Sequence, residues 1–155
     1  MCNREVLLIF DLDDFLPFRL HLAAESTSQR FYPQYRDVFK INRTEWRVFF
    51  HIGQHGPITA NRISRMSRLE KSKISRAITK LEERGWVERS YSQGHRRSHD
   101  LLLTHNGTET FQALAEMAAQ FNDMLEEHLG KGEMKKILEQ LRSLEDRINQ
   151  LPEAD

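Results

Sequence analysis

The side chains best able to bind another molecule lie in one segment, residues 71–84. Its apolar residues recur at spacings of three and four, which predicts a helix that buries Ile74, Ala77, Ile78 and Leu81 on one face. The other face would carry hydroxyl and basic side chains: Lys71, Ser72, Lys73, Ser75, Arg76, Thr79 and Lys80. Long cations reach phosphates and base edges, and small hydroxyl residues let a helix backbone approach them closely. The segment therefore predicts a helix that binds nucleic acid.

A shorter capped helix precedes this segment. Pro57 lies in a turn, and Thr59 is of a residue type that caps helices, so we expect a helix over Ala60–Ser67. Ile63 and Met66 would face inward. Two helices joined by a few residues are typical of the helix-turn-helix motif, in which the second helix enters the major groove of DNA.

A β-hairpin is predicted after the basic helix. Gly85 ends the helix, and Trp86–Tyr91 alternates apolar and polar residues in the manner of a strand. Ser92–His95 supplies turn residues, and Leu101–Thr104 supplies the returning strand. Helices followed by a hairpin in this order predict a mainly helical fold with a small hairpin wing, the winged helix-turn-helix.

Each polar residue of this arrangement has an expected partner on DNA. Lys73 and Arg76 are long enough to reach bases or phosphates, whereas Ser72 and Ser75 allow the backbone to come close. The other cations are better placed for backbone phosphates, which fix register without reading sequence. The candidate DNA-binding residues are Thr59, Lys71, Ser72, Lys73, Ser75, Arg76, Lys80, Arg96 and Arg97. A merely solvated polar face is the alternative for an isolated helix, and the neighbouring capped helix and basic hairpin favour DNA.

The zero net charge of the chain conceals a strong asymmetry. Residues 1–60 carry seven Lys or Arg and seven Asp or Glu, residues 61–105 carry eleven against five, and residues 106–155 carry five against eleven. The basic third coincides with the predicted DNA-binding lobe. An acidic tail held away from DNA leaves that lobe as the attractive surface.

Helices are also predicted before this lobe. The apolar spacing over residues 16–31 indicates a first helix with Asp14 as its N-cap, Pro17 in its first turn and an end near Pro33. A second helix follows, capped by Thr44.

The tail of the chain predicts two more helices. One begins near Thr108, and Gly130–Gly132 separates it from the other. The last helix has apolar residues at alternating spacings of four and three, the seam of a coiled coil: Ile137, Leu141, Leu144, Ile148 and Leu151. A helix of the same chain or of a second copy would cover this stripe equally well. A winged domain of this size leaves few elements to cover both terminal helices.

Several classes of protein are disfavoured by the composition. No stretch approaches the ~18 apolar residues of a membrane span, and the N-terminus lacks the features of a signal peptide, so we expect a cytoplasmic protein with no membrane partner. Cys2 is the only cysteine, which rules out a disulfide within the chain and leaves no argument for a redox role.

Catalytic and metal-binding functions find little support either. His51 and His55 straddle a predicted helix end, and His95 and His99 lie in the predicted wing, with no acid or thiol at ligand spacing beside either pair. No set of nucleophile, base and orienting residue occurs, nor a phosphate-binding glycine loop. We expect no metal, no cofactor and no enzymatic activity.

Residues about 14–130 resemble the multiple antibiotic resistance regulator (MarR) family of bacterial transcription factors. The segments that carry the resemblance are Thr44–Val48, Ile58–Thr59, Lys71–Arg76, Leu81–Arg89 and Leu103–Gly107. It implies one domain over residues 1–155, with dimerisation helices over 14–36 and 108–151 around a DNA-binding lobe over 44–104. A homodimer would bind double-stranded DNA at a pseudo-palindromic operator, usually as a repressor.

The chain departs from the family pattern in the wing. The family has an Asp two residues before an Arg that enters the minor groove. Arg97 matches the Arg, but His95 stands at the Asp position. We therefore expect Arg97 to contact DNA while held less rigidly, and we add His95 to the candidate DNA-binding residues as a titratable group near phosphates.

The resemblance also implies an effector, because many family members bind small aromatic or phenolic acids. The candidate ligand-binding residues are Phe18, Arg19, His21 and Trp46, which offer rings to stack and a cation for a carboxylate. Core packing explains the two aromatic residues equally well. Two further hypotheses stay open: a winged-helix module that binds an acidic protein or RNA, and a metal-responsive regulator of the same fold.

Overall fold

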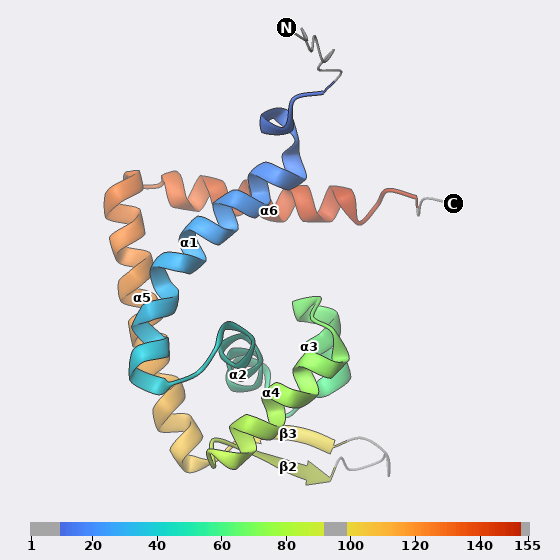
Figure 1. Cartoon of the computed structure of the whole chain (residues 1–155), viewed down its shortest axis with the longest axis vertical. Helices are drawn as coiled ribbons and strands as arrows, with labels where there is room; N and C mark the ends of the chain where they lie inside the picture. The colour runs from blue at the N-terminus through green and yellow to red at the C-terminus, as the bar shows by residue number, and fades with distance from the viewer. Residues whose placement is uncertain (1–9, 92–98, 153–155) are drawn as a thin grey trace, which may run out of the picture. The chain divides into compact units, whose positions relative to one another are not determined.

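The computed structural model describes residues 10–91 and 99–152, and these form helices and one small sheet (Figure 1). In chain order the elements are the 3-10 helix η1 (Leu12–Asp14), α1 (Leu16–Phe39), α2 (Arg43–His55), β1 (Ile58–Thr59), α3 (Ala60–Ser67), α4 (Lys71–Glu83), β2 (Val87–Tyr91), β3 (His99–Leu103), α5 (His105–Leu129) and α6 (Glu133–Ile148). The chain divides into two compact units, residues 1–108 and 109–155, and the division falls within α5. The predicted fold class, helical with a hairpin wing, is confirmed.

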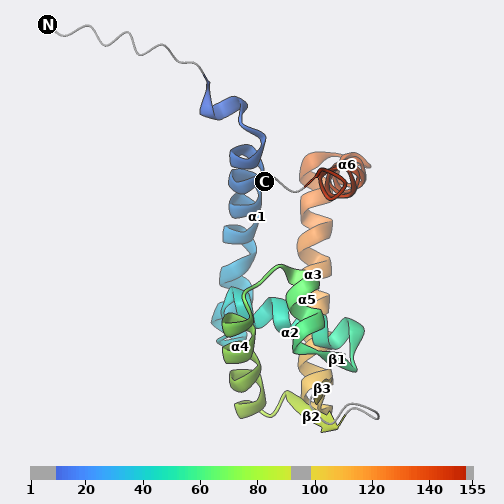
Figure 2. The same cartoon turned by 90° about the vertical axis from the view of Figure 1, so that its right-hand side faces the viewer.

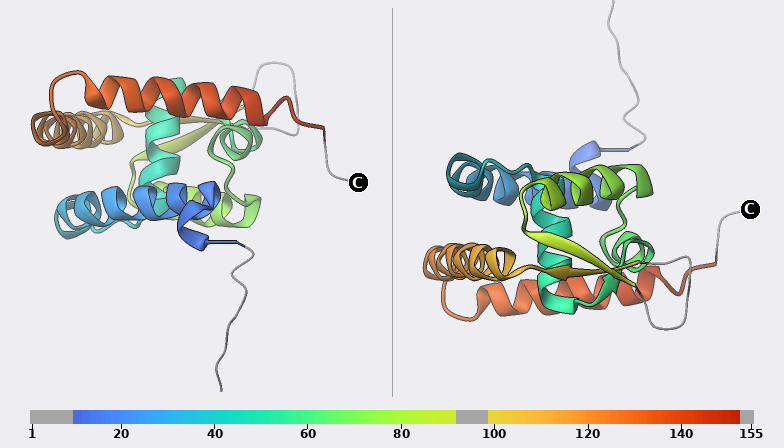
Figure 3. Two further views of the ribbon diagram at one scale, coloured as in Figure 1. Left: turned by 90° about the horizontal axis from the view of Figure 1, so that it is seen from above. Right: turned by 90° about the horizontal axis from the view of Figure 1, so that it is seen from below.

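The sheet has three antiparallel strands in the order β1-β3-β2. The two wing strands lie within two residues of their predicted positions, whereas β1 was not predicted because two residues are too few to show alternation. Ile58 of β1 pairs with Leu101 of β3, and Val87 of β2 pairs with Leu103. Ile58, Leu101 and Val87 are buried. Seen from below, the hairpin of β2 and β3 continues from the end of α4 (Figure 3).

The core of the first unit lies where α2, α3 and α4 pack on one another and on the sheet. The predicted buried face of α4 is confirmed, since Ile74, Ala77, Ile78 and Leu81 are all buried. The buried residues that α2 and α3 contribute are Glu45, Val48, Phe49, Ile52 and Ile63. This apolar contact leaves the polar face of α4 turned away from the core.

The N-terminus of α2 is capped by Asn42, and the prediction of Thr44 as the cap was wrong. The side chain of Asn42 accepts hydrogen bonds from the backbone N–H groups of Thr44 and Glu45, both at 2.9 Å. The Glu45 carboxylate accepts in return from the Asn42 N–H at 3.0 Å, which completes a capping box. A reciprocal pair satisfies more of the free N–H groups of a helix end than one hydroxyl could.

Helix α1 is longer than predicted. It begins at Leu16 after Phe15, not after Asp14, which lies in η1; Pro17 does lie in the first turn as predicted. It also continues through Pro33 to Phe39. Phe31 is buried shortly before this proline, and the packing of α1 around it outweighs the lost hydrogen bond. The half of α1 before Phe31 buries none of its residues and extends away from α2, α3 and α4 (Figure 2).

The remaining helices also differ in detail from the prediction. Helix α5 begins at His105, three residues before the predicted Thr108, because the Thr104 hydroxyl accepts a hydrogen bond from the Gly107 N–H. The break at Gly130–Gly132 is confirmed. Helix α6 buries none of its residues, and Leu151 of the predicted stripe lies beyond its end.

In α3, the prediction that Met66 faces inward was wrong. Ile63 is fully buried, whereas Met66 is 42% exposed. A spacing of three residues rotates Met66 by about 60° from Ile63, which in a helix of two turns takes it to the edge of the core.

This difference predicts unequal effects of truncation at the two positions. Ile63→Ala should lower the free energy of unfolding by about 2–5 kcal/mol because it leaves a cavity. Met66→Ala should cost less than about 1 kcal/mol because its side chain is already partly in water. Urea unfolding of both variants measures the two losses, and equal losses would contradict the placement of Met66.

Candidate nucleic-acid interface

The turn between α3 and α4 is built from serine hydroxyls. Thr59 caps α3 by accepting from the Arg62 N–H at 3.3 Å, as predicted. The Ser64 hydroxyl donates to the Leu69 carbonyl at 2.9 Å, and Arg68 adopts the left-handed conformation that turns the chain. Local bonds therefore fix the angle at which α4 leaves α3, and they bring Thr59 and the start of α4 into one motif.

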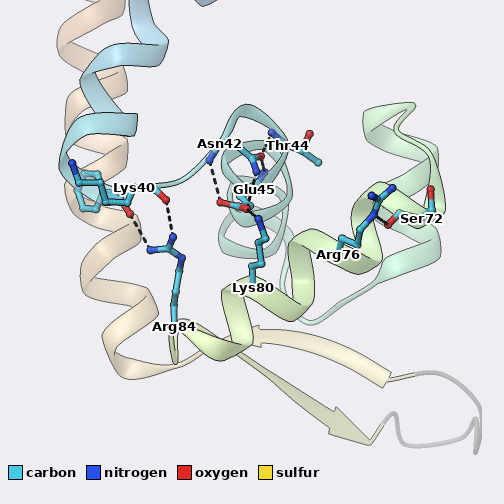
Figure 4. A network of polar contacts seen from close by, with 9 residues as sticks. Lys40, Asn42, Thr44, Glu45, Ser72, Arg76, Lys80 and Arg84 are labelled. Carbon is cyan, nitrogen blue, oxygen red and sulfur yellow. Dashed lines mark hydrogen bonds and ion pairs between the residues drawn. The ribbon is translucent and has the colours of Figure 1, made fainter.

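The polar face of α4 is exposed along the whole helix. All seven residues predicted on it are solvent-exposed: Lys71, Ser72, Lys73, Ser75, Arg76, Thr79 and Lys80. At 13 residues the helix is about 20 Å long, enough to lie along a major groove. The Arg76 Nε–H donates to the Ser72 carbonyl at 3.3 Å, which holds the guanidinium along the helix surface (Figure 4).

Lys80 lies differently from the other cations of this face. Its ammonium is 3.2 Å from the carboxylate of Glu45, a buried side chain in the first turn of α2 (Figure 4). The same carboxylate accepts hydrogen bonds from Asn42. One buried acid thus caps α2 and holds the middle of α4, which makes Lys80 a connection between two helices as well as a candidate phosphate contact.

A groove of about 280 Å³ runs between the N-terminus of α2 and this side of α4. Its polar lining includes Thr44 from α2 and Lys73, Arg76 and Lys80 from α4. Three cations against the single carboxylate of Glu45 give the groove a positive surface. Anionic ligands, DNA phosphates among them, are the chemistry that it suits.

The wing is joined to α4 through its base. The Arg89 guanidinium on β2 makes two hydrogen bonds to the Glu82 carboxylate on α4, at 2.7 and 3.0 Å, and this pair raises the pKa of Arg89 above its usual value. Between them Gly85 has φ +69°, a left-handed conformation that glycine adopts without strain. The strand direction of the wing is therefore fixed relative to α4. His95, Arg96 and Arg97 lie outside the described residues.

The candidate effector residues do not all lie together. Trp46 on α2 packs against Phe31 and Tyr35 of α1 and against Phe50, with ring centroids 4.4–5.7 Å apart. Its Nε1–H is buried and has no hydrogen-bond partner. Burial in this cluster raises the pKa of Tyr35 to about 12.

The other three candidates lie near the start of α1. Phe18 is half-buried, and Arg19 and His21 are exposed. The Arg19 guanidinium is 3.6 Å from the carboxylate of Asp13. Phe18 precedes Phe31 by 13 residues, or about 20 Å of helix, so the structure does not bring these residues to Trp46 within one chain.

The histidines show no sign of a metal centre in the part of the chain that the structure describes. His51 and His55 stack with centroids 6.0 Å apart, and no group of three His, Cys, Asp or Glu residues there could hold a metal ion. Within the same described residues, no helix combines the length and apolarity that crossing a membrane requires.

Two functional residues were not singled out in the sequence. Glu45 had a detectable signal, because Asn-x-x-Glu at residues 42–45 is a capping-box pattern. Arg84 had none: its guanidinium donates to the carbonyls of Phe39 at 3.1 Å and Lys40 at 2.6 Å, more than forty residues away (Figure 4). Only the folded chain reveals such a contact.

A capped helix, an outward-facing basic helix and a hairpin fixed behind it define a winged helix-turn-helix protein. Comparison with known proteins gives the family. Residues 39–98 match the model of the MarR family. The chain is also 25% identical over 122 residues to the HTH-type transcriptional regulator FarR of Neisseria gonorrhoeae, a match that covers 75% of this chain and 84% of that protein.

Solved structures show the same fold. The MarR/EmrR family regulator from Acinetobacter sp. ADP1 has a TM-score of 0.80 at 22% identity, covering 92% of this chain and all of that chain. NadR in complex with 4-hydroxyphenylacetate has 0.74 at 22%, covering 84% and 92%. A putative MarR family regulator from Listeria monocytogenes complexed with 26mer DNA has 0.75 at 12%, covering 87% and 89%. The chain belongs to the MarR family and is a DNA-binding transcriptional regulator.

The aromatic cluster leads to a prediction about pH. Burial lowers the pKa of His51 below its ordinary value of 6.5, with the charge of His55 as a second cause. The unfolded chain then binds a proton more readily than the folded one, so His51 favours folding above about pH 6.5, and this contribution is lost as the pH falls toward its lowered pKa.

We expect His51→Gln to reduce the loss of unfolding free energy between pH 7.5 and 5.5, measured by urea unfolding. His21→Gln, which replaces an exposed histidine, should keep the wild-type dependence. A His51→Gln profile that runs parallel to the wild type would show that His51 does not cause the dependence.

Proposed function

We propose that the protein binds a pseudo-palindromic operator as a homodimer and acts there as a repressor. The observation that carries this proposal is the exposed basic and hydroxyl face of α4, backed by an apolar face buried on α2. A helix held in this way presents its side chains to a major groove without unfolding any core. The DNA-bound MarR-family neighbour from Listeria monocytogenes supports the same mode of binding.

Exposed apolar residues in both units support the homodimer. In the first unit, Leu16 and Leu22 of α1 are exposed. In the second, Ile137, Leu138 and Ile148 of α6 are exposed on a helix that buries nothing. Apolar helix faces of this kind are usually covered in the functional assembly. Two-fold symmetry would then place two α4 helices in successive major grooves of the operator.

We further propose that the protein works in the cytoplasm and acts by binding rather than by catalysis. A winged-helix module that meets an acidic protein or RNA is the competing function, and the comparisons do not favour it. A salt titration separates the two. Specific DNA binding requires a steep fall of affinity with salt together with an excess over random duplex of roughly a thousandfold or more.

The test begins with selection of bound duplexes from a random pool, which should yield a pseudo-palindrome. On the selected duplex, Arg76→Ala should weaken binding by about tenfold to a hundredfold, because a guanidinium that reaches a base edge contributes about 1–3 kcal/mol. Arg142→Ala on α6 is the matched control, and it should bind like the wild type. Enrichment of no sequence at all would overturn the proposed function.

We also propose a small phenolic or aromatic acid as effector, bound beside Trp46. The NadR neighbour is in complex with 4-hydroxyphenylacetate. The cluster of Phe31, Tyr35, Trp46 and Phe50 offers rings for such a ligand, and the unpartnered Trp46 Nε1–H offers a donor for its oxygen. The surrounding rings would have to move aside to admit it.

Trp46→Phe tests this effector site, because it keeps a ring and removes the donor. Calorimetric titration with 4-hydroxyphenylacetate should show affinity about tenfold lower than in the wild type, the effect of one lost hydrogen bond of about 1–1.5 kcal/mol. Trp86→Phe is the matched control and should not change the affinity. Equal binding by the Trp46→Phe variant and the wild type would remove Trp46 from the site.

A further inference from the structure

A second positive surface lies at the corner where α1 ends and α2 begins. It is a hollow of about 390 Å³ lined on one side by the last turns of α1 and on the other by α4. Four cations line it, Arg36 and Lys40 from the corner and Lys80 and Arg84 from α4, against the two carboxylates of Asp37 and Glu45. The hollow therefore carries an excess of positive charge.

Both carboxylates are already bound within the protein. The Arg36 Nε lies 2.7 Å from the Asp37 carboxylate, and the buried Glu45 carboxylate accepts from Asn42 and pairs with Lys80. By contrast, no acid among the described residues forms an ion pair with Lys40, whose side chain is exposed. Lys40 is thus the cation of the hollow that is best able to meet an external anion.

The backbone around Lys40 is held in place. Lys40 ends α1 in the left-handed conformation, with φ 55°, and its carbonyl accepts a hydrogen bond from Arg84 at 2.6 Å. The second bond from Arg84 goes to the Phe39 carbonyl, so one guanidinium joins the end of α4 to the end of α1 (Figure 4). The position of Lys40 relative to α4 is therefore fixed.

The hollow continues the groove beside α4. The two share Asn42, Glu45 and Lys80 as lining residues. Lys73, Lys80 and Arg84 are spaced by seven and four residues, so they follow one edge of α4, roughly a quarter turn from its buried stripe. A helix lying in a major groove has a phosphate backbone along each edge, and this edge leads directly to Lys40.

We propose that the α1–α2 corner, through Lys40 with Arg36 beside it, binds backbone phosphates of the operator strand next to α4. The proposal rests on the proposed function, because it extends the DNA contact of the same lobe. The contact is with phosphates only, so it adds affinity without reading sequence. It lengthens the protein's footprint on DNA beyond the recognition helix.

The experiment measures the salt dependence of operator binding by full-length Lys40→Gln. Each lost phosphate contact lowers the slope of log K against log salt by about 0.9, or about 1.8 for two copies in a dimer. Each contact also removes about threefold from the fall in affinity between 50 and 200 mM salt. The ratio of operator to random-duplex affinity should stay unchanged. Lys135→Gln on α6 is the matched control, expected to keep the wild-type slope.

Lys40→Asn provides a second variant, because Asn tolerates the left-handed conformation while losing the charge. A wild-type slope in both variants would overturn the inference. If inorganic phosphate then raises the Tm of the wild type but not of the variants, the hollow takes a free anion instead of DNA, and the inference fails. Absence of specific binding by the wild-type protein would be a failure of the proposed function itself, which the selection experiment detects separately.

Discussion

The packing of α2 against α4 is the contact on which the rest of this structure depends. Ile74, Ile78 and Leu81 bury one face of α4 against a core that includes Phe49 of α2. Because that face is committed to the core, every hydroxyl and basic residue of α4 points outward together. The alternation of three- and four-residue spacings thus sets both the stability of the lobe and the chemistry of its surface.

Polar contacts then fix how α4 is oriented within this packing. Glu45 caps α2 and pairs with Lys80, and Arg84 binds the carbonyls at the end of α1. On the other side Glu82 holds Arg89 at the base of the wing. Apolar packing alone tolerates small rotations, whereas hydrogen bonds with defined donors and acceptors do not. Helix, wing and α1–α2 corner therefore present their charges in one fixed arrangement.

The distribution of charge and of apolar surface follows the division of labour along the chain. Cations concentrate in residues 61–105, where the exposed face of α4 lies, while the acids concentrate after residue 105. Exposed leucines and isoleucines occur on α1 before Phe31 and on α6. A binding lobe with uncovered helices attached to it is the arrangement expected of a regulator that works as a symmetric pair.

The sequence by itself determined what depends on local pattern: the buried stripe of α4, the Thr59 cap, the glycine breaks and the basic centre of the chain. These features follow from periodicity and capping chemistry, which neighbouring residues encode. The tertiary structure alone decided the continuation of α1 through Pro33, because burial of Phe31 outweighs the missing hydrogen bond. It alone also decided the partners of Lys80 and Arg84, since attraction between charged groups depends on distance in space rather than along the chain.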